Sequence, residues 1–307
     1  MYIGVDLGGT NIAVGLVNSN GEILSQGSRP TLSSRHYSEI VKDIAELCIE
    51  VTQAGGKDIS DIKGIGIGAP GSVDSERGIV VYADNLDWHN LPLADELRKY
   101  IDVPIKIEND ANAAAYGEYV VNGDNKDNFV AITLGTGVGG GIIIDKKIYR
   151  GFNGAGGELG HITLQRNGEP CGCGNMGCWE AYASVTALIK QTKRAIAENP
   201  DSLMAKDEKV SGKTAFVAAK AGDAAGQKVV DQYLEYVAAG ITSIVNIFQP
   251  DVLVIGGGIS KEGDYLLNPV KEYVEKHNYA KGLPQTELKI ATLMNDAGII
   301  GAALVAM

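Results

Sequence analysis

Residues 129–145 read Phe129-Val-Ala-Ile-Thr-Leu-Gly-Thr-Gly-Val-Gly-Gly-Gly-Ile-Ile-Ile-Asp145, which predicts a strand, a glycine turn and a second strand. Residues 2–17 open the chain on the same pattern, with a glycine turn between two apolar runs. Setting Asp6 against Thr133 brings the two glycine turns into register. A motif that recurs in both halves of a chain indicates two related α/β lobes, and we expect a cleft between them.

Hydrophobic periodicity and turn residues divide the rest of the chain into helices and strands. The stretch that follows residue 69, to about residue 90, has no clear period and is predicted to be irregular. Further strands are predicted at residues 22–25, 63–68, 104–108, 251–255 and 286–290. Helices are predicted at residues 35–54, 110–122, 181–196, 211–221, 223–247, 264–276 and 297–306.

Composition limits the classes of function. The 307 residues are 45% hydrophobic, which suits a protein with a substantial core, and no apolar run reaches the length of a membrane span. A net charge of −11 argues against nucleic acid, whose binding needs clustered Lys and Arg. Such a protein can still bind ATP through backbone amides, helix N-termini and a metal ion. The opening residues do not resemble a secretion signal, so we expect a cytoplasmic protein.

Three of the four cysteines lie close to a histidine in one glycine-rich segment that runs from His161 to Glu180. Three thiolates and one imidazole make a closed tetrahedral zinc shell, and Cys171, Cys173 and Cys178 are spaced for it. The alternatives are buried free thiols or a disulfide. The absence of a secretion signal disfavours the disulfide, and the flexible, polar segment disfavours core packing, so we expect zinc.

The two glycine turns are candidate phosphate-binding loops. Two matches to G-x-G-x-x-G, at residues 66–71 and 135–140, do not open helices and therefore do not predict a dinucleotide site. Either turn taken alone is better explained as an ordinary β-hairpin. Their equivalent positions, beside Asp6 and Thr133, favour phosphate binding by exposed backbone N–H groups. Asp6 is then placed to hold Mg²⁺ through water.

Asp110 stands at the junction of a predicted strand and a predicted helix, in Glu108-Asn-Asp-Ala-Asn112. An Asp or Asn at this position is a common helix cap. A carboxylate there can also serve as the general base that accepts a proton from a substrate hydroxyl during phosphoryl transfer. Spacing alone does not separate the two roles, and both can hold.

These motifs together resemble the ROK family of sugar kinases, repressors and related proteins, within the hexokinase, Hsp70 and actin superfamily. The resemblance spans nearly the whole chain. Its motifs are two phosphate loops, the segment with the catalytic aspartate, the zinc segment with its flanking carboxylates, and an adenosine-side loop: Asp6–Asn11, Leu134–Gly141, Glu108–Asn112, Glu158–His161 with Cys171–Glu180, and Gly256–Ser260.

The resemblance implies a two-lobed, actin-like α/β fold with a ribonuclease H-like core in each lobe. The small lobe would comprise residues 1–115 and 297–307, and the large lobe residues 116–296. It also implies ATP, Mg²⁺ and a structural zinc ion as cofactors, with Asp110 as the catalytic base. The residues implied for ATP and Mg²⁺ are Asp6, Gly8, Gly9, Thr10, Asn11, Thr133, Gly135, Thr136, Gly137, Gly256, Gly257 and Gly258. Zinc would be held by His161, Cys171, Cys173 and Cys178, and the sugar by Asn85, Asn109, Asp110, Glu158, His161 and Glu180.

Within the family, Asn85-Leu-Asp-Trp88 and Cys178-Trp-Glu180 look like bacterial glucokinases, which implies conversion of glucose to glucose 6-phosphate as a step of glycolysis. The alternative is a kinase of N-acetylglucosamine or N-acetylmannosamine. A less favoured alternative is a sugar-sensing repressor relative. Such repressors carry a helix-turn-helix ahead of the kinase-like part, and we expect none here because the chain opens at its first strand. The resemblance further implies a homodimer or a dimer of dimers.

Overall fold

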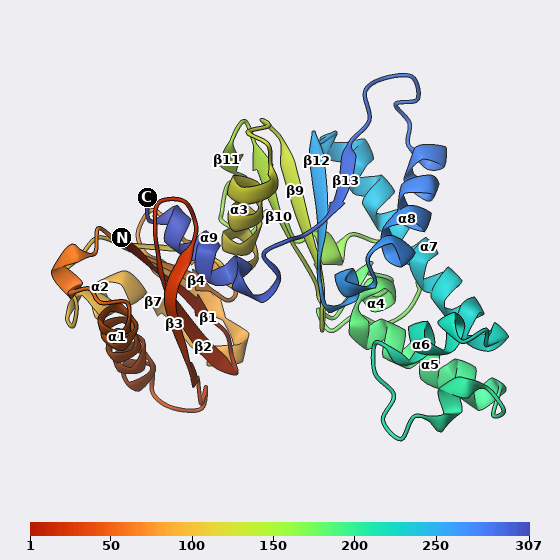
Figure 1. Ribbon diagram of the computed structural model, residues 1–307, viewed down its shortest axis with the longest axis horizontal. Helices are drawn as coiled ribbons and strands as arrows, with labels where there is room; N and C mark the ends of the chain where they lie inside the picture. Colours follow the sequence, from red (N-terminus) through yellow and green to blue (C-terminus); the bar gives the residue numbers. More distant parts are fainter. The chain divides into compact units, whose positions relative to one another are not determined.

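The computed structural model describes residues 1–307, and Figure 1 shows its helices and strands along the chain. The strands are β1 Tyr2–Leu7, β2 Asn11–Val17, β3 Ile23–Pro30, β4 Ile65–Ala69, β5 Ser72–Asp74, β6 Ile79–Ala83, β7 Trp88–Leu91, β8 Ile105–Asn109, β9 Phe129–Leu134, β10 Val138–Ile144, β11 Lys147–Ile148, β12 Val252–Gly257 and β13 Glu287–Ile290. The α-helices are α1 Tyr37–Ala54, α2 Leu93–Arg98, α3 Asp110–Asn122, α4 Glu180–Ala183, α5 Val185–Glu198, α6 Thr214–Lys220, α7 Ala224–Phe248, α8 Asp264–His277 and α9 Ala297–Val305.

The chain divides into two compact units. The first unit comprises residues 1–127, 141–157 and 293–307, and the second comprises residues 128–140 and 158–292. The predicted α/β class with two sheets is confirmed, because each unit contributes strands to a five-stranded sheet covered by helices. None of the helices is at once long enough and apolar enough to cross a membrane.

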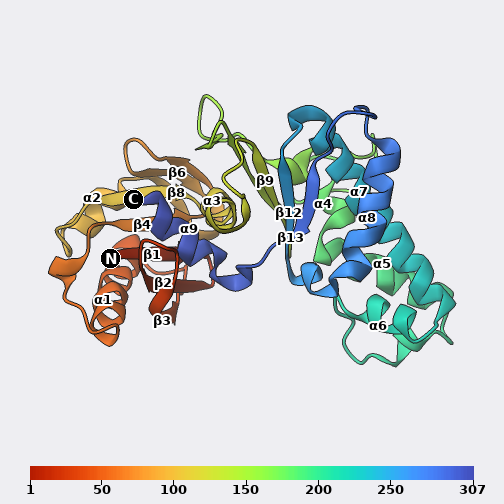
Figure 2. The same cartoon turned by 45° about the horizontal axis from the view of Figure 1, so that its top comes forward.

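The first unit is built on a sheet of order β3-β2-β1-β4-β8, with β1, β4 and β8 parallel. Helix α1 packs against β2 and β3, whereas α9 packs against β1 and β4 (Figure 2). The strands approach α9 so closely that a Cβ on Gly4 would lie 1.8 Å from the carbonyl oxygen of Ile299. The same holds for Gly66, whose Cβ would lie 1.7 Å from the carbonyl oxygen of Ala302. Glycine on these strands therefore sets the distance between sheet and helix.

The second sheet has the order β11-β10-β9-β12-β13, and β12 runs parallel to both β9 and β13. The long helix α7 packs against α4, α5, α6 and α8, which gather on the right of Figure 1. Helix α7 buries side chains along most of its length, and Tyr233 is fully buried. This helical layer supports the loops at the carboxyl ends of β9 and β12.

Two predictions of secondary structure were wrong. The stretch after residue 69 is not irregular, because β5, β6 and β7 form a three-stranded antiparallel sheet and α2 follows them. Val81 and Tyr82 of β6 are exposed, which obscures the two-residue alternation that marks a strand. The single helix predicted over residues 181–196 is two helices, since Ser184 is extended and caps α5.

Candidate functional site

In the first unit, the candidate residues gather where the parallel strands β1, β4 and β8 end. Asp6 lies opposite Gly68 in β4, and Gly68 lies opposite Glu108 in β8. Loops at the carboxyl ends of parallel strands are a general location for ligand sites. Asp6, Asn109 and Asp110 therefore reach this edge from two different strands.

Asp6 and Asp110 are close enough to interact electrostatically. Burial of the Asp6 carboxyl and, to a lesser degree, the nearby charge of Asp110 together raise its pKa to about 6. The Asp6 carboxylate also lies against Gly298 at the start of α9, where a Cβ would come 2.5 Å from Oδ2. Two carboxylates held together in this way favour a cation between or beside them. This set therefore fits the Mg²⁺ position predicted for Asp6.

The cap of α3 is Asn109, and Asp110 is the first helical residue. The Oδ1 atom of Asn109 accepts the Asn112 N–H at 3.1 Å, and its Nδ2 donates to the carbonyl oxygen of Gly71 at 3.0 Å. Asp110 Oδ1 accepts the N–H of Ala111 at 2.8 Å. Asn109 therefore supplies the cap, and Asp110 lies in the first turn of the helix.

The first glycine turn joins β1 to β2. The N–H of Gly8 donates to the Asn11 carbonyl at 2.9 Å, and the Thr31 hydroxyl donates to the Gly8 carbonyl at 2.6 Å. Asn85, a predicted sugar ligand, lies beside this turn, because a Cβ on Gly9 would come 2.9 Å from Asn85 Nδ2. The turn is thus held by neighbours while Thr10 and Asn11 are exposed.

In the second unit, the other two glycine loops lie side by side. Gly256 and Gly257 of β12 pair with Thr133 and Leu134 of β9, so Gly256–Gly258 adjoins the turn Gly135–Gly137. The amino end of α5 supports that turn, since its first N–H donates to the Gly135 carbonyl at 2.8 Å. The hydroxyl of the next residue in α5 donates to the Thr136 carbonyl at 2.7 Å.

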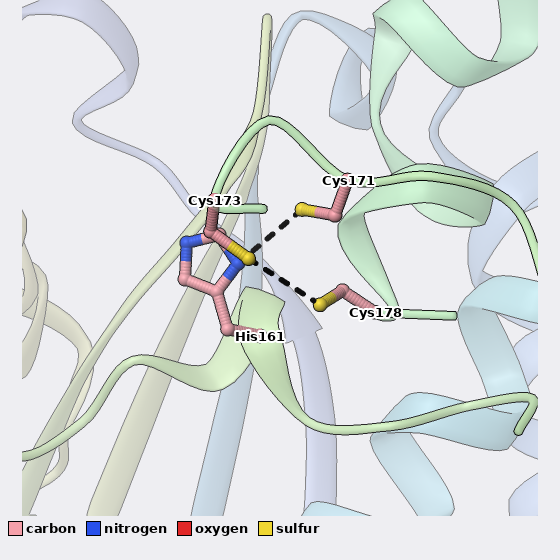
Figure 3. Close-up of side chains that lie close together, drawn as sticks. All are labelled: His161, Cys171, Cys173 and Cys178. Atoms are coloured by element: carbon pink, nitrogen blue, oxygen red, sulfur yellow. Dashed lines mark hydrogen bonds between the residues drawn. The ribbon is translucent and has the colours of Figure 1, made fainter. Parts of the chain in front are cut away.

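The same unit brings His161, Cys171, Cys173 and Cys178 together, and Figure 3 shows their side chains facing one another. Their ligand atoms all lie within 4.8 Å of one another. Tetrahedral zinc with bonds of about 2.3 Å to sulfur and about 2.0 Å to nitrogen would place sulfur atoms about 3.8 Å apart. The Sγ atoms of Cys173 and Cys178 are 3.7 Å apart, and Cys171 Sγ lies 3.6 Å from His161 Nδ1. The cluster is consistent with a structural zinc site.

The protonation of these groups is linked to metal binding. Burial raises the pKa of the Cys178 thiol to about 12, whereas backbone N–H donation by Asn175 lowers the pKa of Cys173. Zinc binds thiolates, so loading the site must release protons. His161 presents Nδ1 to the Cys171 thiol, so Nε2 is the ring nitrogen on the other side of the imidazole.

Glu180 connects the zinc segment to the second glycine turn. Its Oε2 accepts the N–H of Val138 at 3.0 Å, and its Oε1 accepts from Cys171 Sγ at 3.6 Å. A Cβ on Gly137 would come 2.3 Å from Glu180 Oε2. Glu158 is exposed at the start of the short 3₁₀ helix that contains His161.

The predicted residues therefore form two groups, one in each unit. The first unit contains Asp6, Gly8, Gly9, Thr10, Asn11, Asn85, Asn109 and Asp110. The second contains Thr133, Gly135, Thr136, Gly137, Glu158, His161, Cys171, Cys173, Cys178, Glu180, Gly256, Gly257 and Gly258. Sequence analysis did not single out the buried ion pair between Glu108 and Arg150. An acid within the apolar strand β8 is the one signal that could have drawn attention to it.

Comparisons with known proteins show which family the chain resembles over its whole length. The ROK family model matches residues 2–307. The glucokinase of Halalkalibacterium halodurans is 40% identical, over 98% of this chain and 93% of that protein. A crystal structure of a ROK family glucokinase from Streptomyces griseus, in complex with glucose and AMPPNP, matches with a TM-score of 0.83 and 37% identity over 99% of this chain and 98% of that one. The xylose repressor of Bacillus subtilis is 33% identical, over 97% of this chain and 75% of the repressor.

Proposed function

We propose that this chain, which belongs to the ROK family, phosphorylates the 6-hydroxyl of glucose with ATP to give glucose 6-phosphate and ADP. Its similarity to glucokinases at 40% identity over nearly its whole length supports this proposal, and so does the S. griseus relative with bound glucose and AMPPNP. The alternative is a kinase of N-acetylglucosamine or N-acetylmannosamine. A less favoured alternative is a sugar-sensing repressor, and the B. subtilis xylose repressor is the more distant of these relatives at 33% identity.

The observation that carries the proposal is the pair of carboxylates Asp6 and Asp110. Burial and repulsion from Asp110 raise the pKa of Asp6 to about 6, so the folded protein is destabilised when Asp6 is ionised. Recognition of a sugar alone does not require two carboxylates held this way. Strongly perturbed acids at strand ends are typical of catalytic sites. A kinase uses both groups, since one can hold a cation and the other can accept the proton of the attacking hydroxyl.

The chain's own residues divide the work. Asp110 accepts the proton of the sugar hydroxyl, and Asn109 orients the start of α3 while it caps the helix. Exposed N–H groups of the turns Gly8–Asn11 and Gly135–Gly137 bind phosphate oxygens, and Gly256–Gly258 borders the adenosine. Glu158, Glu180 and His161 Nε2 hydrogen-bond sugar hydroxyls. When bound, Mg²⁺ neutralises charge that develops on the phosphate oxygens, and Asp6 is the residue that would hold it through water.

The zinc segment has a structural role in this mechanism. Three thiolates and one imidazole leave no open coordination position for water, so the metal does not supply the nucleophile. Zinc held by these four residues would fix the orientation of His161 and hold the segment from Cys171 to Glu180 in place.

A panel of free sugars assayed with ATP and Mg²⁺ tests the proposal. Glucose should give the highest kcat/KM, with the phosphate on the 6-hydroxyl. Preferred turnover of N-acetylglucosamine or N-acetylmannosamine would assign the chain to the alternative kinase class. Sugar binding with no phosphorylation of any sugar would assign it to the sensors and overturn the proposal.

A further inference from the structure

Glu108 is a fully buried carboxylate that the proposed mechanism does not use. Its side chain is 1% exposed, and it precedes the segment with Asn109 and Asp110. Five donors from four residues converge on it. Oε2 accepts from Arg150 Nε at 2.7 Å, from Arg150 Nη2 at 2.5 Å and from the hydroxyl of Ser75 at 3.3 Å. Oε1 accepts the Asn109 N–H at 3.1 Å and Asn112 Nδ2 at 3.2 Å.

The Arg150 side chain supplies the positive charge that this carboxylate needs. A buried carboxylate without a cation is strongly disfavoured, and hydrogen bonds from a charged guanidinium are among the strongest available to it. Here Nε and Nη2 of Arg150 both donate to one oxygen, Oε2. Arg150 follows β11, so it joins a segment distant in sequence to the end of β8. Its side chain is 38% exposed, whereas that of Glu108 is 1% exposed, so the carboxylate relies on the arginine for its compensation.

Glu108 contacts both residues that shape the start of α3. Its Oε1 holds the backbone of Asn109 and the side chain of Asn112, and the backbone N–H of Asn112 is itself the group that Asn109 caps. Asp110 lies between these two positions, in the first turn of the helix. A change in Glu108 therefore moves the backbone from which the Asp110 carboxylate projects.

From these contacts we propose that Arg150 and Glu108 are a positioning pair for Asp110. Arg150 fixes the Glu108 carboxylate, Glu108 fixes the turn from β8 into α3, and that turn sets the geometry between Asp110 and the substrate hydroxyl. The proposal rests on the proposed function, in which Asp110 is the base. Neither residue of the pair touches the substrate in this account.

The test is the steady-state kinetics of Arg150→Met, Arg150→Lys and Glu108→Gln at a temperature where circular dichroism shows equal folded fractions. Misplacement of a catalytic group by about 1 Å costs on the order of 100-fold in rate. We therefore expect Arg150→Met and Glu108→Gln to lower kcat by about 10- to 100-fold, with the KM for ATP within about threefold of wild type. Arg150→Lys keeps the charge but loses the pair of guanidinium N–H groups that converge on Oε2, so its kcat should fall between wild type and Arg150→Met.

Arg29→Met is the matched control. Arg29 bridges β3 to α1 through ion pairs with Glu46 and Glu50. Arg29→Met therefore removes the same type of side chain from an ion-paired site in the same unit, away from Asp110. It should lower stability and leave kcat unchanged. The double variant Glu108→Gln with Arg150→Met should be no slower than the slower single variant, because the two residues act as one unit.

The outcomes separate the two proposals. Wild-type protein that does not phosphorylate glucose contradicts the proposed function itself. Active wild-type protein with an Arg150→Met kcat within twofold of wild type, or equal to that of Arg29→Met, contradicts the positioning pair. If Arg150→Met does not fold, the kcat values of Arg150→Lys and Glu108→Gln test the proposal in its place. An unchanged kcat in both variants would contradict the proposal that Arg150 and Glu108 position Asp110.

Discussion

Asp6 occupies a position that costs folding free energy. Its carboxyl is partly buried and interacts unfavourably with Asp110, so its pKa is about 6 rather than 3.8. At neutral pH the folded protein holds this group ionised where the unfolded chain would ionise it more readily. The residue is therefore a site where function is favoured over stability.

Asp6→Asn should stabilise the protein in a pH-dependent way. Because the folded pKa is raised, the penalty is absent below pH 3.8, grows as pH rises, and is complete above about pH 6. At pH 8 the free energy of unfolding should exceed that of wild type by up to about 3 kcal/mol, and the difference should shrink as pH falls toward 4. Urea unfolding without added divalent cations measures this. A difference independent of pH would contradict the account of Asp6.

The role of a single residue was predictable where its residue type allows few kinds of chemistry. The zinc residues are such a case, because few other roles explain three clustered cysteines with a histidine, and the structure brings them together. The role of Asp110 as a base stays a prediction, because an acid at the end of a strand can also cap a helix. The Glu108 and Arg150 pair was not predictable, because the two residues are distant in sequence and each alone has no distinctive neighbour. Asn109 was proposed as a cap or a sugar ligand, and the structure shows that it caps α3.

At the scale of elements, contact between β4 and α9 depends on glycine. We expect Gly66→Ala to lower the free energy of unfolding by about 3 kcal/mol or more, because its Cβ would lie 1.7 Å from a backbone oxygen of α9 and neither element can shift independently. Gly68→Ala in the same strand is the control for stability. Its Cβ would meet its nearest neighbours at 3.4 Å, so it should cost less than about 1 kcal/mol. Equal stability of the two variants in urea unfolding would contradict this reading of the sheet.

The segment from His161 to Cys178 has little regular structure, so we expect it to depend on a bound zinc ion. Plasma emission spectrometry of the purified protein should find one zinc ion per chain. Cys171→Ser should lower zinc content and weaken glucose binding, measured by calorimetry, since Cys171 contacts both His161 and Glu180. Cys48→Ala, which removes the buried cysteine of α1, should keep full zinc content. A metal-free protein with full activity would overturn the zinc assignment.

At the scale of the whole molecule, the repeated strand–turn–strand motif was the useful signal. It predicted two sheets, because each repeat supplies adjacent strands with a glycine turn between them, and the order β3-β2-β1 and β10-β9-β12 bears this out. The small sheet β5-β6-β7 was missed, because β5 has three residues and β6 exposes two apolar side chains. Short strands with apolar residues on both faces lack the period on which such a prediction depends.

The central claim is that Asp110 is the base in glucose phosphorylation, and one comparison tests it most directly. Asp110→Asn keeps the size and the hydrogen bond of the side chain but cannot accept the proton. General-base catalysis contributes about 10²- to 10⁴-fold, so its kcat with ATP should fall by at least 100-fold. Calorimetry should show that glucose still binds, and the exposed variant Asp87→Asn should keep wild-type kcat. Full turnover by Asp110→Asn would contradict the account.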